Sequence, residues 1–270
     1  MRGPSGCCAN RGFVPDSIRV TARSRTAALL GAVALVAGLL GASPAVRSED
    51  GAAVARRVAE TYAAATHGIV AFDVTTHTQL RAGPFRRDDL EDGAYVAVDG
   101  KPVRKRVIRY LDGRHAASSD DLQRLSAKPD PPLTRFGMRL PYLTEGVDAY
   151  AFDAPREGDG GTVIAFRATV RDEAHGDGTM TLDSQYRPVR VVFHPAKLPP
   201  KHEGTATVTE ATVTVEFGIV ATGRWEVTRL VHAFSGRYGP LGARADATTS
   251  YDAYRFFPTV ELAHAAIERE

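Results

Sequence analysis

The stretch Thr205–Ile219, TATVTEATVTVEFGI, alternates between apolar and polar side chains along its second half. The apolar positions are Val213, Val215 and Phe217, and the polar positions between them are Thr212, Thr214 and Glu216. A period of two indicates a β-strand with one buried face. The turn Thr222-Gly-Arg224 follows and leads into a second apolar run, Trp225–Phe234, so the two segments predict a β-hairpin.

Similar short strands are predicted on both sides of this hairpin. They cover Thr162–Val170, Thr179–Asp183, Val189–Phe193 and Ala243–Arg255, and nearer the N-terminus Gly68–Leu80, Tyr95–Val98 and Val103–Leu111. With shorter segments, this gives about nine to eleven strands joined by turns. No strand–helix–strand alternation occurs among them, so the pattern predicts an antiparallel sheet.

Two helices are predicted. Gly51–Thr66 places Val54, Val58 and Tyr62 on one face, as in an amphipathic helix. Ser118 and Ser119 provide an N-cap for a short second helix that ends near Ala127. An apolar, proline-rich loop, Lys128–Leu143, comes next.

The predicted fold class is therefore mainly β (α+β). A strongly twisted antiparallel sheet wraps around the N-terminal helix, with a short helix and a loop inserted near the middle. Residues 46–258 are expected to form this single domain, and residues 259–270 a short polar C-terminal tail that is either helical or frayed.

Residues 1–45 are predicted to be an N-terminal extension and a signal peptide. The apolar run Ala27–Ala42 follows Arg23 and Arg25 and precedes Ser43-Pro44-Ala45, which has the small residues of a cleavage site. The run is shorter than the roughly 20 residues that cross a bilayer, so we expect cleavage near Ala45 rather than an uncleaved anchor. A translation start at Val20 would give a more typical signal peptide. The expected location is periplasmic or secreted, with no stable membrane span.

Removal of this leader changes the composition. Cys7 and Cys8 both lie within it, so the mature protein is expected to have no disulfide and no thiolate metal site. The leader holds five arginines and one acid, which leaves 29 basic and 31 acidic side chains in residues 46–270. This balance gives no electrostatic basis for a nucleic-acid partner.

Three segments together resemble a known family. They are the helix Ala52–Thr66 that runs into the strand Gly68–Leu80, the hairpin from Gly178–Asp183 to Arg187–Phe193, and the last strand, Thr249–Phe256. In this arrangement, residues 52–257 resemble the bacterial periplasmic lipoprotein carriers and the related outer-membrane lipoprotein-sorting proteins.

The resemblance implies an unclosed β-barrel, shared with the sigma-factor regulators of the envelope. It also implies an apolar concave face that holds acyl chains or another hydrophobic partner. No functional residue of those carriers matches a position of this chain, so none is carried over.

The expected ligand site is this concave face. One helix is too small to cover so many apolar positions, and each CH₂ removed from water gains about 0.8 kcal/mol. The expected ligand is therefore a lipid or an acyl chain, with the loop Lys128–Leu143 as a lid. The residues predicted to line the site are Phe72, Val74, Phe136, Met138, Ile164, Phe166, Val215, Phe217 and Trp225.

Two alternatives stay open. In the first, the helix and the loop fill the sheet completely, and the protein is a structural or protein-interaction module of the envelope. The second, a secreted hydrolase, is less favoured because the sequence has no nucleophile elbow, phosphate loop or dinucleotide motif. The best candidate for a cation site is the cluster Asp172, Glu173, His175 and Asp177, with carboxylate oxygens and an imidazole, but its composition is more typical of a polar turn. We therefore expect no enzyme, and no catalytic residues, metal ligands or cofactors.

Overall fold

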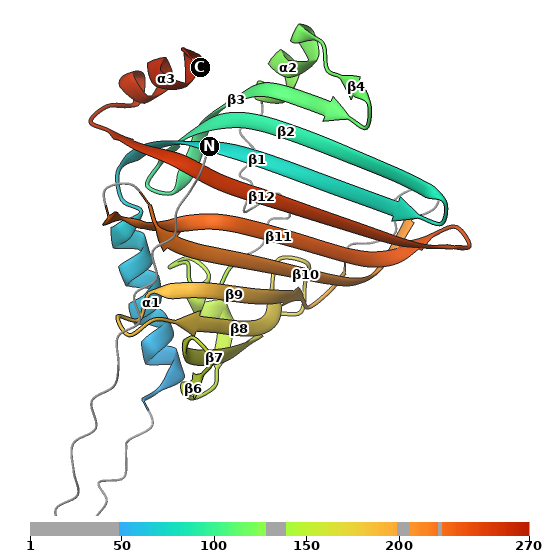
Figure 1. Ribbon diagram of the computed structural model, residues 1–270. Coiled ribbons are helices and arrows are strands. Elements are labelled where there is room, and N and C mark those ends of the chain that lie inside the picture. The colour runs from blue at the N-terminus through green and yellow to red at the C-terminus, as the bar shows by residue number, and fades with distance from the viewer. Residues whose placement is uncertain (1–48, 128–138, 199–205, 221–222, 270) are drawn as a thin grey trace, which may run out of the picture. The chain divides into compact units, whose positions relative to one another are not determined.

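The computed structural model describes residues 49–127, 139–198, 206–220 and 223–269 (Figure 1). Its helices are α1 Gly51–Ala65, α2 Ser119–Ser126 and α3 Val260–Glu268, with a 3₁₀ turn at Val147–Ala149. Its strands are β1 Ile69–Ala82, β2 Phe85–Val98, β3 Lys101–Asp112, β4 His115–Ala116, β5 Tyr150–Phe152, β6 Arg156–Gly158, β7 Gly161–Ala168, β8 Gly176–Leu182, β9 Pro188–Pro195, β10 Ala206–Ile219, β11 Trp225–Tyr238 and β12 Leu241–Phe257.

The twelve strands form one antiparallel sheet in the order β4-β3-β2-β1-β12-β11-β10-β9-β8-β7-β5, with β6 also paired to β7. The last strand, β12, lies between β1 and β11, so the N-terminal and C-terminal hairpins meet in the middle of the sheet. Within the described strands, the two edges of the sheet do not pair with each other. The sheet is thus unclosed, and the predicted mainly-β fold class is confirmed.

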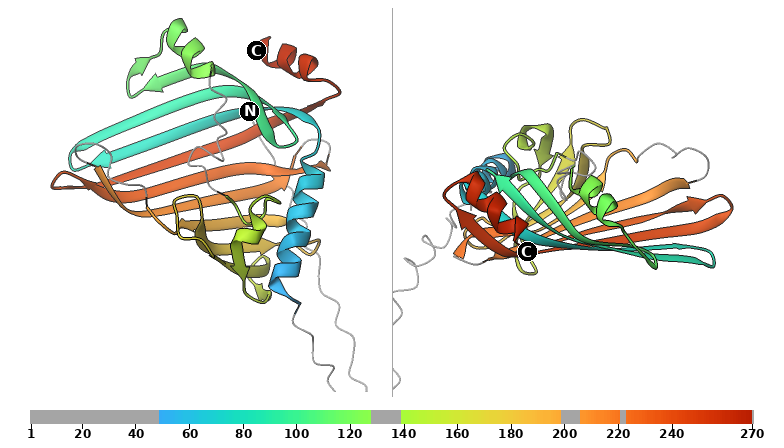
Figure 2. Two further views of the ribbon diagram at one scale, coloured as in Figure 1. Left: turned by 180° about the vertical axis from the view of Figure 1, so that it is seen from behind. Right: turned by 90° about the horizontal axis from the view of Figure 1, so that it is seen from above.

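The two faces of the sheet carry different helices. We call the face against which α1 packs the inner face, and the opposite face the outer face. Seen from behind, α1 lies in front of the strands (Figure 2). On β1 the inner side chains are Val70, Phe72 and Val74, and the alternation continues through Thr76, Thr78 and Leu80 to Ala82. On the outer face, Ala71 belongs to the cluster that packs against α3.

Helix α1 confirms the predicted first helix. The Asp50 carboxylate accepts a hydrogen bond from the Ala52 N–H at 3.2 Å and so caps the helix. Val54 and Val58, one helical turn apart, are completely buried in the main core. The apolar face seen in the sequence therefore turns toward the sheet, and burial of that face stabilises the helix more than its intrinsic propensity does.

Helix α2 confirms the second prediction. Ser118 and Asp121 form a capping box, in which each side chain binds the backbone N–H of the other residue. The Ser126 hydroxyl at the end of the helix accepts a hydrogen bond from the Val107 N–H at 2.8 Å. This contact attaches α2 to β3, near one edge of the sheet.

The C-terminal segment is more ordered than the polar tail expected over residues 259–270. Thr259 caps α3, and Ala263 and Ile267 on its apolar face are completely buried. They pack on outer-face residues of β1 and β2, among them Ala71 and Ala94. The small alanine side chains leave room for the helix, which explains the difference from the expected tail. None of the helices in the described part of the chain is long and apolar enough to cross a membrane.

Candidate functional site

The inner face near α1 is filled by the protein itself. Six of the nine residues expected to line a ligand site have 8% or less of their surface exposed, and all six belong to one core cluster: Phe72, Val74, Ile164, Phe166, Val215 and Phe217. They come from β1, β7 and β10. A ligand cannot reach these side chains without displacing the protein's own core.

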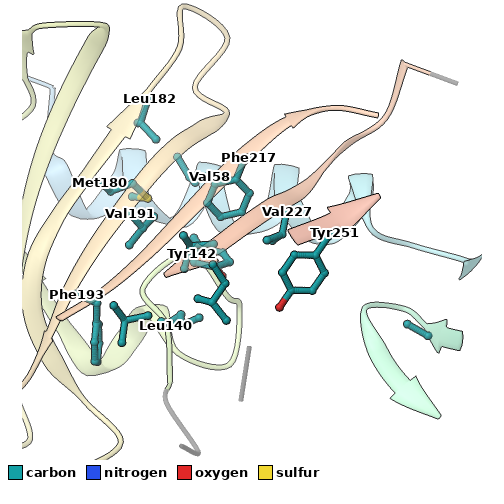
Figure 3. Packing of buried hydrophobic residues seen from close by; sticks show 14 of the residues in the cluster. Val58, Leu140, Tyr142, Met180, Leu182, Val191, Phe193, Phe217, Val227 and Tyr251 are labelled. Carbon is teal, nitrogen blue, oxygen red and sulfur yellow. The ribbon is translucent and has the colours of Figure 1, made fainter. Parts of the chain in front are cut away.

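Helix α1 and residues 140–142 occupy the space above these strands. Leu140 and Tyr142 have 1% or less of their surface exposed and lie among the core side chains of the sheet (Figure 3). The rings of Tyr142 and Phe217 meet edge-on with centroids 5.1 Å apart, and Tyr62 of α1 makes the same kind of contact with both. Such aromatic pairs add stability beyond the area that they bury. The end of the segment expected to be a lid is thus a fixed part of the core.

The other three expected residues are placed differently. Trp225 is partly buried at the edge of the same core, where its indole N–H donates to the Pro188 carbonyl at 2.6 Å and Arg187 lies over its ring. These contacts fix Trp225 as a packing residue. Phe136 and Met138 lie outside the described residues.

Polar contacts mark where this core ends on the inner face. Lys105 of β3 and Glu91 of β2 form an ion pair at 2.7 Å, with side chains only 4% and 13% exposed. The hydroxyls of Thr76 and Thr249 share a hydrogen bond at 3.0 Å. Burial of charged groups costs far less when they are paired with each other. Beyond Thr76 and Thr249, the inner side chains of β12 are alanines and are more exposed.

An alanine strip lies on the inner face of β12 beyond this boundary. It consists of Ala243, Ala245 and Ala247 on β12, with Leu80 and Thr78 beside them on β1. All five side chains are partly exposed, in contrast to the buried residues near α1. The strip was missed in the sequence, although the alternating alanines of RADATTS were visible inside a predicted strand. Without the sheet order, nothing in the sequence showed that Leu80 lies beside Ala245.

Glu226 is the described acid with the most altered environment. It is 6% exposed, and burial raises the pKa of its carboxyl from 4.5 to about 7, although the nearby Arg224 lowers it. The Arg224 guanidinium is 3.8 Å from this carboxylate and also donates to the backbone carbonyls of Ala65 and His67 at the end of α1. Burial of this carboxylate with one distant cation has a cost in stability that depends on pH.

The charged side chains of the polar turn before β8 form hydrogen bonds and ion pairs with nearby residues of the same segment. Asp172 accepts hydrogen bonds from the backbone N–H groups of Ala174 and His175 and contacts the His175 ring at 2.7 Å. The hydrogen bond to His175 lowers the pKa of Asp172. Asp177 binds Arg171 at 2.7 Å instead. Over the described ranges, no group of three His, Cys, Asp or Glu residues is arranged to hold a metal ion.

A surface pocket lies elsewhere, near β1, β2 and β3. Its lining includes His77, Leu90 and Leu111, which lie side by side in the register of β1, β2 and β3, with Asp88 next to them. The alternation on β1 places His77 on the outer face. The lining also includes Asp89, the register partner of Thr78 on β1.

No model of a protein family matches the sequence, and no curated protein matches it. Similar solved structures do exist. One is a putative outer membrane lipoprotein-sorting protein domain from Vibrio parahaemolyticus, 12% identical, with a TM-score of 0.41 over 81% of this chain and 100% of that chain. A DUF1329 family protein from Desulfovibrio piger is 10% identical, with a TM-score of 0.40 over 81% and 99% of the two chains. A LolA superfamily protein from Nitrosomonas europaea is 11% identical, with a TM-score of 0.34 over 77% and 96%. The lipoprotein-sorting proteins that the sequence resembles are thus among the solved structures to which this chain is similar.

Proposed function

We propose that this protein is an exported, non-catalytic binding module of the bacterial envelope, and that it takes an apolar ligand such as a lipid acyl chain on the alanine strip. One observation carries the proposal: the inner face is divided into a part filled by the protein's own core and a part whose apolar side chains are partly exposed. The ligand site is placed on this second part, away from the six buried residues first expected to line it.

The strip suits an extended apolar ligand. Ala243, Ala245 and Ala247 span about 13 Å along β12, at 3.3 Å per residue. Their side chains are small and partly exposed, and Leu80 of β1 lies beside Ala245. Each CH₂ of a ligand that leaves water here gains about 0.8 kcal/mol. A short run of methylene groups is thus enough for measurable binding.

Export is part of the same proposal. The basic residues, apolar run and small-residue site of residues 1–45 form the layout of a signal peptide, and these residues lie outside the described ranges. Ligand binding then takes place in the periplasm or outside the cell.

The second candidate function is a protein-interaction module of the envelope. The burial of Phe166, Val215 and the other four expected ligand residues favours it, because a filled core leaves only surfaces for a partner. The two candidates differ in what the alanine strip binds, and a direct binding experiment separates them.

The test uses delipidated protein recovered after export of the full chain, titrated with a fluorescent fatty-acid analogue. Ala245→Trp places a bulky ring on the strip, between Leu80 and Phe234, and we expect it to weaken binding about tenfold or more. The matched control is Thr248→Trp, which adds the same ring to the outer face of the same strand. Equal binding by both variants, or no binding by the wild type, would contradict the acyl-chain proposal and favour the protein-interaction module.

A further inference from the structure

The tips of two neighbouring hairpins lie at the end of the sheet opposite α1. One tip joins β1 to β2 and the other joins β11 to β12, and Figure 1 shows them next to each other at the right, with α1 at the left. The Gly83 N–H donates to the Gly242 carbonyl at 3.3 Å and connects the two turns. The Leu241 side chain also lies close to Gly83, within 3.1 Å of where a Cβ would be. The two tips therefore form one surface.

This tip surface is apolar and exposed. Phe85 and Tyr238 are each 53% exposed and Leu241 is 39% exposed, so three of the large exposed apolar side chains of the described chain gather here. Pro84 and Pro240 are exposed in the two turns. Because proline has no N–H, these turns present fewer backbone donors that would lose water at an apolar boundary. A clustered apolar surface of this kind indicates a binding site.

A row of arginines lies directly behind the tips on the outer face. Arg86, Arg81 and Arg244 are direct neighbours across β2, β1 and β12 in the register of the sheet. Like charges directly opposite each other destabilise a sheet, so an anionic surface that contacts the row would relieve this repulsion. Arg237 adds a fourth exposed arginine, whereas Asp246 binds Arg244 at 2.7 Å and offsets part of the charge.

We propose that the tip surface docks on an anionic phospholipid bilayer, with Phe85, Tyr238 and Leu241 inserted between the headgroups. Aromatic rings and leucine at the level of the headgroups, with arginines reaching the phosphates, are the features of an interfacial membrane contact. Each arginine near an anionic leaflet strengthens binding about fivefold. A protein partner would account for the apolar side chains, but the arginine row favours the bilayer. Ala243, at one end of the alanine strip, lies two residues from Leu241 at the tip. The docked protein therefore holds that end of the strip at the lipid surface.

The test measures partition of the protein, expressed as the full chain, into vesicles. One set contains phosphatidylglycerol and phosphatidylethanolamine, and the other contains phosphatidylcholine alone. We expect binding to the anionic vesicles, weakened by salt. Phe85→Glu combined with Leu241→Glu is expected to lower this binding at least about tenfold. Arg81→Gln combined with Arg86→Gln is expected to lower it on the anionic vesicles alone. Any leader is common to all variants, so the difference between them reports on the tips.

The matched control is Ile219→Glu. Ile219 is 64% exposed and apolar, but it lies at the other end of the β10–β11 ladder from Tyr238. It should leave the partition unchanged. Equal loss in this control, equal binding to phosphatidylcholine, or no binding to anionic vesicles overturns the proposal. Loss of a dimer in the Phe85→Glu and Leu241→Glu variant, with vesicle binding retained, also overturns it and assigns the tips to self-association.

A second readout does not depend on a disruptive substitution. Tyr238→Trp keeps a large ring at the tip, and its fluorescence should shift to the blue and be quenched by brominated lipid when anionic vesicles are added. Ile219→Trp is the control, and the single natural tryptophan, Trp225, is common to both. An unchanged spectrum in Tyr238→Trp overturns the proposal even where the glutamate variant fails to fold.

Discussion

Glu226→Gln should make the protein more stable at neutral and alkaline pH. Glu226 has one carboxylate oxygen that is buried without a hydrogen-bond partner within the described structure, and only Arg224, 3.8 Å away, faces it as a cation. Glutamine keeps the shape of the side chain but has no charge to bury. The Arg224 guanidinium keeps its hydrogen bonds to the carbonyls of Ala65 and His67, so the contact at the end of α1 remains.

The magnitude follows from the pKa. Burial raises the pKa of Glu226 from 4.5 to about 7 in the folded protein. Between these values the folded protein holds a proton that the unfolded chain has released, so the free energy of unfolding falls as the pH rises. Each pKa unit corresponds to about 1.4 kcal/mol, so the complete loss is about 3 kcal/mol above the folded pKa. Below pH 4.5 both forms are protonated, and this loss disappears.

The assay is urea unfolding of wild type and Glu226→Gln at several values between pH 4 and pH 8. We expect similar free energies of unfolding near pH 4, and an advantage of about 3 kcal/mol for the variant at pH 8. Glu216→Gln is the control, since Glu216 is a partly exposed residue of the neighbouring strand, paired with Arg229 at 3.5 Å, and should change stability by less than about 1 kcal/mol. A difference between Glu226→Gln and wild type that does not grow from pH 4 to pH 8 would refute the reasoning.

Two further substitutions test the inner face. Lys105→Met removes the cation that lies 2.7 Å from the largely buried Glu91, and should lower the free energy of urea unfolding by about 3 kcal/mol. Adding Glu91→Gln should recover much of this loss, because no unpaired charge is then buried. If the double variant recovers no stability, the ion pair is not the cause of the loss. Tyr142→Phe removes a buried hydroxyl that makes no hydrogen bond in the described structure, and should raise the melting temperature through a gain of about 1 kcal/mol. Its control is Tyr254→Phe, which removes a hydroxyl that donates to the Val227 carbonyl and should lower stability by a similar amount.

The secondary structure was predictable where local pattern decides it. In β10 and in α1, one face of the element is buried and therefore carries apolar side chains. This produces the period-two alternation of the strand and the apolar face of the helix. The β8–β9 hairpin follows the same rule. It also needs Gly178, because a Cβ there would lie 1.9 Å from the Val192 carbonyl oxygen of the neighbouring strand. That close approach is a tertiary contact, and the glycine alone did not show it.

Register was less predictable. The residues of β3 around Val107 and Ile108 alternate ambiguously in the sequence. In the structure a bulge shifts the register of β2 and β3 between Asp92 and Gly93, so Val107 is buried and the next residue, Ile108, is 43% exposed. An extra residue in one strand changes which face the following side chains occupy, and the pattern of a single strand does not reveal it.

The burial of the six residues predicted to line the site was not predictable for a related reason. One helix is indeed too small to cover the apolar residues of the inner face, as the sequence suggests. Leu140 and Tyr142 complete the cover, and the tyrosine packs against Phe217 from a strand far away in the sequence. Counting apolar positions shows how much surface must be covered, whereas only the packing shows which segment covers it.

Along strand β12, the inner side chains change from buried tyrosines to partly exposed alanines. Near α1 its inner side chains are Tyr254 and Tyr251, both buried in the core. Past Thr249 they become the three alanines of the strip, and at the tip Leu241 is exposed. Large side chains fill the space beneath α1, whereas alanines follow on the part of the strand over which no described helix lies. A protein that only needed a stable core would gain from larger apolar side chains at Ala245, since each added CH₂ that became buried would contribute about 0.8 kcal/mol. The alanines forgo that stability, and under the proposed function the apolar ligand takes the place of the larger side chains.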